Sequence, residues 1–472
     1  MQDIKKQIPT IAIIGGGFSG TMTAIHLMRQ SDVSLHIILI NHRYPLAKGI
    51  AYSSYSNKHL LNVAAKNMSA FPDKSDDFLK WLKNHDNYGA LDQNELPGTF
   101  LPRNIYGKYL KDTFENAIRK KSENVTIEFI HDEAIDLEIK DSRVQVYFSV
   151  SPTVIADKVV LAMGNPDPRH PDFNNDKFLN SNRYFPNPWL NTAVSHPDIE
   201  ENILIVGNGL TMVDVVLGLR EKNFQGKIYS LSPHGFRILP HRKFEPYTGL
   251  LEEIHPPYKL KDLVSIFKSH VNKQRKKGES GEAVVDALRP LTQKIWQDLN
   301  EKEKERFMYY LRHMWGVARH RLPMDVHKYI QQMILDDKLE IVAGKILSVD
   351  EHESSAQVSI QRKNNQDVLK IDVSRIINCT GPESNITKIK NPLIRNMLES
   401  KIVSPGDLQM GFKAKADGTI IHPDGSESQS LFTIGSWLKG VLWESTAVPE
   451  LRTQAKNLAE KLIGDSNKQI KS

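Results

Sequence analysis

The sequence contains a single cysteine, Cys379, among its 472 residues. One thiol cannot form an intramolecular disulfide, a Cys-x-x-Cys redox pair or a thiolate metal cluster, so we expect no metal site of that kind and exclude a reductase that works through a cysteine pair. No stretch approaches the roughly 20 apolar residues of a membrane-spanning helix. With 40% hydrophobic and 25% charged residues, the composition is that of a soluble globular protein, and we expect a cytoplasmic location without a membrane partner.

The sequence also lacks a dense run of positive charge. Its net charge is +6, and residues 251–330 supply most of it, with 16 Lys and Arg against 11 Asp and Glu. Acidic residues dilute these cations, and the segment has no interleaving of arginine with aromatic residues. We therefore interpret the basic residues as solvated helix faces and expect no nucleic acid partner.

A glycine motif near the N-terminus organises the first part of the chain. The short apolar run Ile11–Ile14 is typical of a strand buried on both faces of a parallel sheet. Gly15, Gly17 and Gly20 follow as GxGxxG, and a helix comes next. These glycines allow a tight turn, a close approach of a pyrophosphate to the backbone, and close packing of helix on strand. The pattern predicts a dinucleotide site at the helix N-terminus.

The strand expected after this helix, Ser34–Ile40, ends at Asn41. An acidic residue normally stands at this point and hydrogen-bonds the ribose hydroxyls. Asn41 can accept such bonds through its amide oxygen but has no charge. The fold prediction stands, and the identity of the nucleotide is left open by this position.

The strand, glycine turn and helix occur a second time. Asn202–Val206 is an apolar run, Gly207 and Gly209 are the two phosphate-facing glycines, and a helix follows from Leu210. Met212 replaces the third glycine, which leaves both phosphate-facing positions without side chains. Within this helix start, we include Thr211 among the cofactor-binding residues.

The second strand of this repeat, Lys227–Leu231, ends at Ser232 and not at an acidic residue. Arg237, His241 and Arg242 follow closely. A missing carboxylate with arginines nearby favours a 2′-phosphate, so Ser232 and Arg237 predict NADPH over NADH. The alternative is that these cations are ordinary surface residues.

These patterns predict an α/β protein with two Rossmann-like dinucleotide-binding domains and a helical insertion. We expect residues 1–195 to form the first part of an FAD-binding domain and residues 196–340 an NAD(P)H-binding domain. Residues 341–472 are then expected to return to the first domain. The helical insertion is predicted at about 255–335 from its amphipathic pattern.

Two segments between the motifs have further structure. Residues 42–115 are rich in turns and aromatics, and we expect them to pack over a cofactor or substrate. Val125–Ile130 and Val144–Val150 are predicted to be strands of a hairpin or small sheet.

Taken together, the chain resembles two-dinucleotide-domain flavoproteins, and among these the FAD/NAD(P)-binding group related to ornithine and lysine N-hydroxylases. Closer still is the resemblance to bacterial FAD/NAD(P)-binding proteins, some of which are flavin hydroxylases that act on urate or on the amine of aspartate. The motifs that carry it are spread over nearly the whole sequence: GGGFSG, GIAYS, HLLNVAAKNMSAFPD, FLPRNIYGKYL, VVLAMGNP, VGNGLTMVD, INCTGPESN and WESTAVPELRTQA.

The resemblance implies roles for individual residues. Those expected to bind FAD are Gly15, Gly17, Ser19, Gly20, Asn41, Gly164, Gly435, Ser436, Thr446, Ala447 and Val448. The last three would open a helix towards the pyrimidine end of the flavin, where a helix N-terminus stabilises negative charge. His59, Asn62 and Met68 are expected near the isoalloxazine as catalytic residues. Asn41, and Gly435-Ser436 where related proteins often have Gly-Asp, depart from the family pattern.

The implied reaction is an NADPH-dependent hydroxylation of a small polar substrate by O2 through a flavin peroxide. The substrate would be an amino-acid amine such as that of aspartate, or a purine such as urate. If it is anionic, Arg103, Arg319 and Arg321 are the candidate contacts, although Arg319 and Arg321 also fit a role as helix-end cations. The alternatives are an FAD-dependent NAD(P)H oxidoreductase that passes electrons without hydroxylation, and a nucleotide-binding sensor without turnover. A homo-oligomer is possible under each alternative.

Overall fold

The computed structural model describes residues 8–85, 94–195, 197 and 201–471, with side chains to residue 465. The described residues fall into two compact units. The first unit contains the chain up to Ser54, Val63–Pro166 and the chain from Ser384 onward; the second contains Tyr55–Asn62 and Asp167–Glu383. We describe each unit by itself.

The first unit is built on a six-stranded sheet in the order β15-β16-β7-β1-β2-β3. All neighbours are parallel except β15 and β16. The strands are β1 (Thr10–Ile14), β2 (Leu35–Ile40), β3 (Val125–Ile130), β7 (Lys158–Leu161), β15 (Thr419–Ile421) and β16 (Glu427–Thr433). The central strands are apolar on both faces, as buried parallel strands require.

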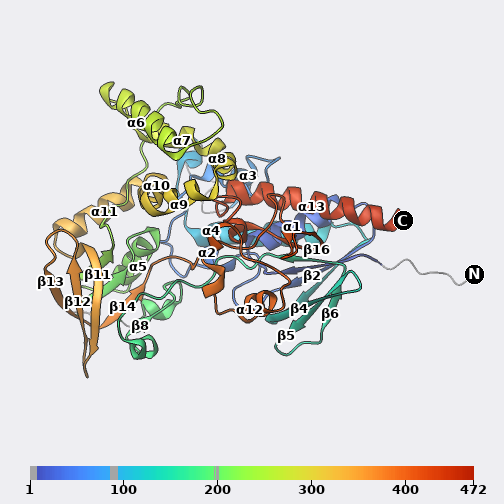
Figure 1. Cartoon of the computed structure of the whole chain (residues 1–472), viewed down its shortest axis with the longest axis horizontal. Helices are drawn as coiled ribbons and strands as arrows, with labels where there is room; N and C mark the ends of the chain where they lie inside the picture. The colour runs from blue at the N-terminus through green and yellow to red at the C-terminus, as the bar shows by residue number, and fades with distance from the viewer. Residues whose placement is uncertain (1–7, 86–93, 196, 198–200, 472) are drawn as a thin grey trace, which may run out of the picture. The chain divides into compact units, whose positions relative to one another are not determined.

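Helices of the first unit pack beside this sheet. The helix α1 (Phe18–Gln30) lies along α13 (Val448–Lys471) and also contacts α4 (Arg103–Lys120) (Figure 1). Two shorter helices, α2 (Gly49–Tyr52) and α3 (Asp77–Lys83), belong to the segment predicted to cover a ligand. The α1 and α13 helices therefore come together from the two ends of the chain.

A small antiparallel sheet of three strands completes the first unit: β4 (Ala134–Lys140), β5 (Arg143–Phe148) and β6 (Val154–Ala156). The helix α12 (Pro392–Glu399) packs on β4. The prediction of a hairpin or small sheet is correct for β5 and wrong for β3, which extends the parallel sheet beside β2. Local sequence patterns identify a strand but do not identify its pairing partner.

The second unit has a seven-stranded sheet in the order β13-β12-β11-β10-β9-β14-β8. Its strands are β8 (Tyr184–Phe185), β9 (Ile203–Val206), β10 (Ile228–Ser232), β11 (Leu339–Glu351), β12 (Ala356–Arg362), β13 (Val368–Val373) and β14 (Arg375–Asn378). From β11 to β8 the neighbours are parallel, and β12 and β13 add antiparallel strands. The helix α5 (Leu210–Glu221) follows β9.

The two sheets share one topology. The order β3-β2-β1-β7 in the first unit corresponds to β11-β10-β9-β14 in the second, and in each a glycine turn leads from the first strand into a helix. This order is that of a Rossmann-like mononucleotide-binding half. The predicted α/β class with two Rossmann-like domains is thus confirmed.

Between β10 and β11 the chain forms a run of helices, in the segment where helices were predicted: α6 (Leu260–Lys276), α7 (Glu282–Ala287), α8 (Thr292–Asp298), α9 (Glu301–Tyr310), α10 (Arg312–Arg319) and α11 (Met324–Leu335) (Figure 1). This insertion has an apolar cluster of its own, which includes Leu250, Tyr258 and Val284. Among the described residues, no helix combines the length and the apolar character that crossing a membrane requires.

The compact units divide the chain differently from the expected domain boundaries. Residues 341–383 were expected to return to the first domain, but β12, β13 and β14 pair within the second sheet. The return to the first unit comes at Ser384. The strand pattern alone could not fix this point, because β14 has the same apolar character as the central strands of either sheet.

Candidate dinucleotide sites

The first glycine turn has two positions with no room for a side chain. Gly15 has φ +114°, and an added Cβ would lie 2.2 Å from the carbonyl oxygen of Ala162. At Gly20 an added Cβ would lie 1.9 Å from the carbonyl oxygen of Gly15, so this glycine lets α1 pack directly against the turn. The sequence motif is therefore explained by close backbone approaches on both sides of the turn.

The middle glycine of the motif has no close contact at the position of a side chain. Gly17 is the N-cap of α1 and contributes no side-chain cap, and the nearest atom to an added Cβ would be the Cα of Gly49 at 3.6 Å. A helix N-terminus with bare N–H groups and the positive end of the helix dipole suits a pyrophosphate. The residues present fit the phosphate groups of a dinucleotide.

Asn41 supports this turn directly. Its Oδ1 accepts a hydrogen bond of 3.3 Å from the N–H of Gly16, and its Nδ2 donates one of 2.8 Å to the carbonyl of Tyr44. An amide oxygen has a second lone pair. The expected ribose contact of Asn41 stays a prediction, to which the structure adds a role in holding the turn.

Three more predicted positions meet beside the turn. Gly435 has φ +79°, and an added Cβ would lie 3.3 Å from Oγ of Ser19. The hydroxyl of Ser436 donates a 2.6 Å hydrogen bond to the carbonyl of Gly164. At Gly164 an added Cβ would find nothing within 4 Å. Segments about 270 and 420 residues apart in sequence are thus brought together in one unit.

The start of α13 is tied to the same region by residues that the sequence analysis did not single out. Gln454 accepts a 3.1 Å hydrogen bond from the N–H of Gly435 and donates one of 2.8 Å to Oγ of Ser445, directly before Thr446. Arg452 donates to the carbonyl of Ser69 at 2.9 Å, next to the buried Met68. Both residues lie in the motif WESTAVPELRTQA. Their position shortly after Thr446–Val448, on the helix expected to face the flavin, was the signal in the sequence that could have identified them.

The second glycine turn reproduces the geometry of the first. Gly207 has φ +115°, and an added Cβ would lie 2.1 Å from the carbonyl oxygen of Cys379 on the neighbouring chain segment after β14. Gly209 is the N-cap of α5, has no side-chain cap, and has nothing within 4 Å of an added Cβ. Met212, at the third glycine position, is buried. The helix N-terminus, which includes Thr211, is therefore open to a phosphate.

A loop after β10 closes onto this second turn. Asn208 donates a hydrogen bond to the carbonyl of Phe236, and Ser232 accepts one of 3.0 Å from the N–H of Gly235. The exposed Arg237 directly follows Phe236 in the sequence, so its backbone begins at the carbonyl that Asn208 of the turn contacts. Its position agrees with the expected role of Ser232 and Arg237 at the nucleotide, which stays a prediction.

Basic side chains from two other segments meet His234 of this loop, and sequence reasoning missed most of them. Lys363 Nζ lies 2.8 Å from Nδ1 of His234, whose ring stacks on Phe236 with centroids 5.1 Å apart. The ring of His313 meets that of His234 at 5.0 Å, and Arg312 donates to Nε2 of His313 at 3.2 Å. Burial and then Lys363 lower the pKa of His234. The crowding of positive groups leaves this cluster suited to an anion.

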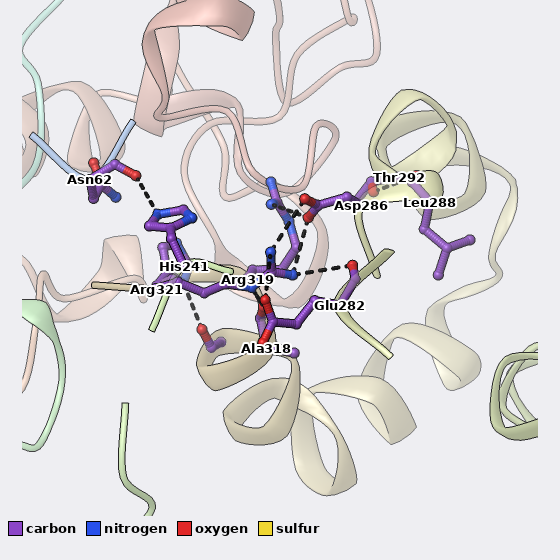
Figure 2. Close-up of polar contacts among 11 residues, drawn as sticks. Asn62, His241, Glu282, Asp286, Leu288, Thr292, Ala318, Arg319 and Arg321 are labelled. Carbon is purple, nitrogen blue, oxygen red and sulfur yellow. Dashed lines mark hydrogen bonds and ion pairs between the residues drawn. The ribbon is translucent and has the colours of Figure 1, made fainter. Parts of the chain in front are cut away.

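His59 and Asn62 are placed in the second unit, whereas Met68 belongs to the first. His59 is 2% exposed, and its Nε2 donates to the carbonyl of Asp214 on α5 at 2.9 Å. The carbonyl of Asn62 accepts a hydrogen bond of 3.1 Å from Nε2 of His241 (Figure 2). Their expected contact with an isoalloxazine stays a prediction, and their contacts with α5 and His241 were not foreseen.

The candidate substrate arginines differ in their surroundings. Arg321 is 2% exposed and forms a two-pronged pair with Asp286, with Nη2 at 3.1 Å from Oδ1 and Nη1 at 3.3 Å from Oδ2 (Figure 2). Its Nε donates to the carbonyl of Ala318 at 2.8 Å. These contacts disfavour a substrate role for Arg321, because the guanidinium is already neutralised. Nη1 of Arg319 lies 4.0 Å from Oδ1 of Asp286. Arg103 is the first residue of α4 and belongs to the first unit, whereas Arg319 and Arg321 belong to the second.

Comparison with known proteins agrees with this geometry. Residues 12–166 match the family model described as FAD-NAD(P)-binding. An uncharacterized protein of Mycobacterium tuberculosis is 20% identical, over 96% of this chain and 95% of its own length.

Two solved structures share the fold over nearly the whole chain. The ornithine N-hydroxylase of Kutzneria sp. 744, solved with reduced FAD, NADP+ and L-ornithine, has a TM-score of 0.62 and 14% identity, covering 98% of this chain and 100% of that one. The FAD-bound cadaverine monooxygenase of Erwinia amylovora has a TM-score of 0.66 and 11% identity, covering 97% and 95%. Residues 12–166 of this chain thus resemble an FAD-NAD(P)-binding domain, and the whole chain shares the fold of these two enzymes.

Proposed function

We propose that the protein is an NADPH-dependent FAD monooxygenase that hydroxylates a small polar substrate. The observation that carries the proposal is the pair of glycine turns with matching geometry. At Gly15 and Gly207 an added Cβ would lie 2.2 and 2.1 Å from a neighbouring carbonyl oxygen, and Gly17 and Gly209 leave the following helix N-termini without side chains. One turn holds one dinucleotide, so two turns in separate sheets suit a flavin nucleotide and a reducing nucleotide.

The first turn is proposed to hold FAD. Its support is the family match over residues 12–166 and the meeting of Ser19, Gly164 and Gly435 beside the turn. FAD, when bound, supplies the electron transfer and oxygen activation that side chains cannot perform. The chain's own residues bind and orient it. We propose that Thr446–Val448 and the N–H groups at the start of α13 face its pyrimidine end, where they stabilise negative charge.

The second turn is proposed to hold NADPH. Ser232, the last residue of β10, is not acidic, and Lys363 and Arg312 bring positive charge to the side chains of His234 and His313 beside the loop that follows β10. A carboxylate there would repel a 2′-phosphate, whereas guanidinium and ammonium groups pair with it. NADPH is therefore favoured over NADH.

For the substrate we propose a primary amine on a small polar molecule. The related folds include enzymes whose names give ornithine and cadaverine, and both molecules carry primary amines. The amine of aspartate stays within this class, and urate is the purine to be tested beside it. Arg103 and Arg319 are the arginines to test if the substrate also bears a carboxylate.

The test is a substrate screen on the FAD-loaded protein. NADPH consumption and product mass are followed together for ornithine, lysine, cadaverine, aspartate and urate. We expect one compound to accelerate NADPH oxidation and to gain one oxygen atom in step with it. NADPH oxidation that forms only hydrogen peroxide with every compound would support an electron-passing oxidoreductase. Protein that cannot be loaded with FAD would contradict both activities.

A further inference from the structure

A short segment of the chain leaves the first unit and returns to it. Tyr55–Asn62 belongs to the second unit, although Ser54 before it and Val63 after it belong to the first. We call this segment the 55–62 strap. It is thus a covalent link between the two units, held in the second unit by the contacts of its own residues.

The strap docks on the helix α5 through Tyr55 and His59. His59 is buried, and its Nε2 lies 2.9 Å from the carbonyl of Asp214. Because a carbonyl only accepts, this nitrogen carries the proton. The ring of Tyr55 meets that of His59 at 5.0 Å, edge to face, and packs against the apolar cluster of α5. The strap therefore grips the helix that begins at the second glycine turn.

A glycine in the middle of α5 makes this docking possible. Gly218 stands four residues after Asp214, on the same face of the helix. An added Cβ at Gly218 would lie 2.9 Å from Oη of Tyr55 and 3.5 Å from Nε2 of His59. Glycine inside a helix is unfavourable by roughly 1 kcal/mol relative to alanine. The docked strap explains why glycine stands at this position of the helix, because a larger residue would collide with Tyr55.

The C-terminal end of the strap is held by a second imidazole. His241 donates from Nε2 to the carbonyl of Asn62 at 3.1 Å (Figure 2). The backbone of His241 is fixed in turn by Leu322, through a 2.7 Å bond from its N–H to the Leu322 carbonyl. Next to Leu322, the buried Arg321 is locked by Asp286. Burial lowers the pKa of His241, which keeps the ring neutral near pH 7.

We propose that the 55–62 strap is a positioning element for hydride transfer, and that His59 and His241 are the positioning residues that dock it on the nucleotide-binding unit. The inference rests on the proposed function. Docking fixes the end of the strap at Asn62, and the chain then re-enters the first unit just before Met68. An undocked strap leaves both nucleotide sites intact but loosens the link between them. The reduction rate then falls while nucleotide affinity stays the same.

The experiment compares four variants of the FAD-loaded, full-length protein. His241→Ala removes the bond to Asn62, and His241→Gln restores an N–H donor. Gly218→Ala places a methyl group on α5 where Tyr55 and His59 contact this helix, and so displaces the other end of the strap. The control is Gly316→Ala on α10, where an added Cβ would find nothing within 4 Å. For each, we measure hydrogen exchange of the 55–62 amides, the rate of FAD reduction at saturating NADPH without oxygen, and the Kd of NADP+.

Loss of one hydrogen bond predicts exchange in the strap that is roughly three- to tenfold faster for His241→Ala and Gly218→Ala, and a reduction rate lower by a similar factor. The Kd of NADP+ should stay within about twofold of the wild type, since the phosphate turn is untouched. His241→Gln should recover most of the rate, and Gly316→Ala should match the wild type.

Three results would overturn the proposal. Wild-type reduction rates in both His241→Ala and Gly218→Ala would remove the positioning role, whether or not exchange changes. A Kd that rises in step with the rate loss would place the defect in nucleotide binding. Slow exchange of 55–62 in every variant would show that these contacts do not hold the strap. If FAD in the wild-type protein is not reduced by NADPH at all, the proposed function is wrong. That result differs from the three above, in which the wild-type protein is reduced and only the role of the strap is contradicted.

Discussion

Substitution by alanine should have different effects at the two glycines of the second turn: lower nucleotide affinity at Gly209 and lower stability at Gly207. At Gly209 the backbone has φ −97° and ψ −169°, which alanine adopts without strain, and an added Cβ meets nothing within 4 Å. Gly209→Ala should therefore fold normally, with a loss at the helix cap of no more than about 1 kcal/mol. The new methyl group occupies the space through which a pyrophosphate reaches the first N–H groups of α5.

The expected loss in nucleotide binding follows from that geometry. Displacing the phosphate from one charged hydrogen bond costs about 1.5–3 kcal/mol, which is roughly a ten- to hundredfold increase in the Kd of NADPH. Gly207→Ala differs, because φ is +115° and the Cβ would lie 2.1 Å from the carbonyl oxygen of Cys379. Backbone strain and overpacking together should destabilise that variant by roughly 2–6 kcal/mol.

The assay is an anaerobic titration of the FAD-loaded protein with NADPH, followed by flavin bleaching, with dithionite reduction as a control for flavin integrity. Gly464→Ala on α13 is the matched substitution, since an added Cβ there also meets nothing within 4 Å and the site is exposed. Gly209→Ala should raise the Kd of NADPH and leave the reduction of the flavin by dithionite unchanged. A Kd within twofold of the wild type for Gly209→Ala, with normal folding, would refute the assignment of the second turn.

Three further predictions concern stability and reactivity. Asp286→Ala should lower the free energy of unfolding in urea by about 1.5–3 kcal/mol, because buried Arg321 loses its two hydrogen bonds to this carboxylate and keeps the ion pair with Glu282 at 3.7 Å. Arg395→Ala, from an exposed pair, should change it by less than about 0.5 kcal/mol, and equal effects would contradict this. Burial lowers the pKa of His26 from 6.5 to about 4, so the unfolded state takes up its proton first as pH falls. Stability should therefore drop by up to roughly 3 kcal/mol between pH 6.5 and 4, and His26→Gln should flatten this dependence; an unchanged slope would contradict it. Burial raises the pKa of Cys379, so its thiol should resist a disulfide reagent in the native protein and react fully in urea, and rapid native labelling would show that the thiol is accessible.

The glycine turns could be predicted from the sequence because the chemistry is local. Gly15 and Gly207 need a positive φ and a close carbonyl, and both demands fall on one residue in a fixed strand-to-helix context. The helical insertion was predictable for the same reason, since its amphipathic period is a local property. The α/β class followed from repeating strand, turn and helix.

What the sequence could not supply is pairing between distant segments. Whether β3 pairs with β2 or with the small sheet, and whether β14 joins the first or the second sheet, depends on partners outside any local window. The cluster of His234, Arg312 and Lys363 joins side chains from three separate segments.

The docking of His59 on α5 was hidden for a related reason. The histidine donates to a backbone carbonyl, that of Asp214, and any residue type can offer such a carbonyl. Gly218 was the one residue in that contact with a local clue, because a glycine within a helix calls for an explanation.

The central claim is that this chain holds a flavin and a reducing nucleotide at two separate glycine turns. The most direct measurement is anaerobic mixing of the purified, FAD-loaded protein with NADPH while the flavin absorption is recorded. The account predicts a yellow protein with one FAD per chain whose absorption bleaches on mixing, with one NADPH oxidised per flavin. A protein that retains FAD but is reduced only by dithionite would contradict the account.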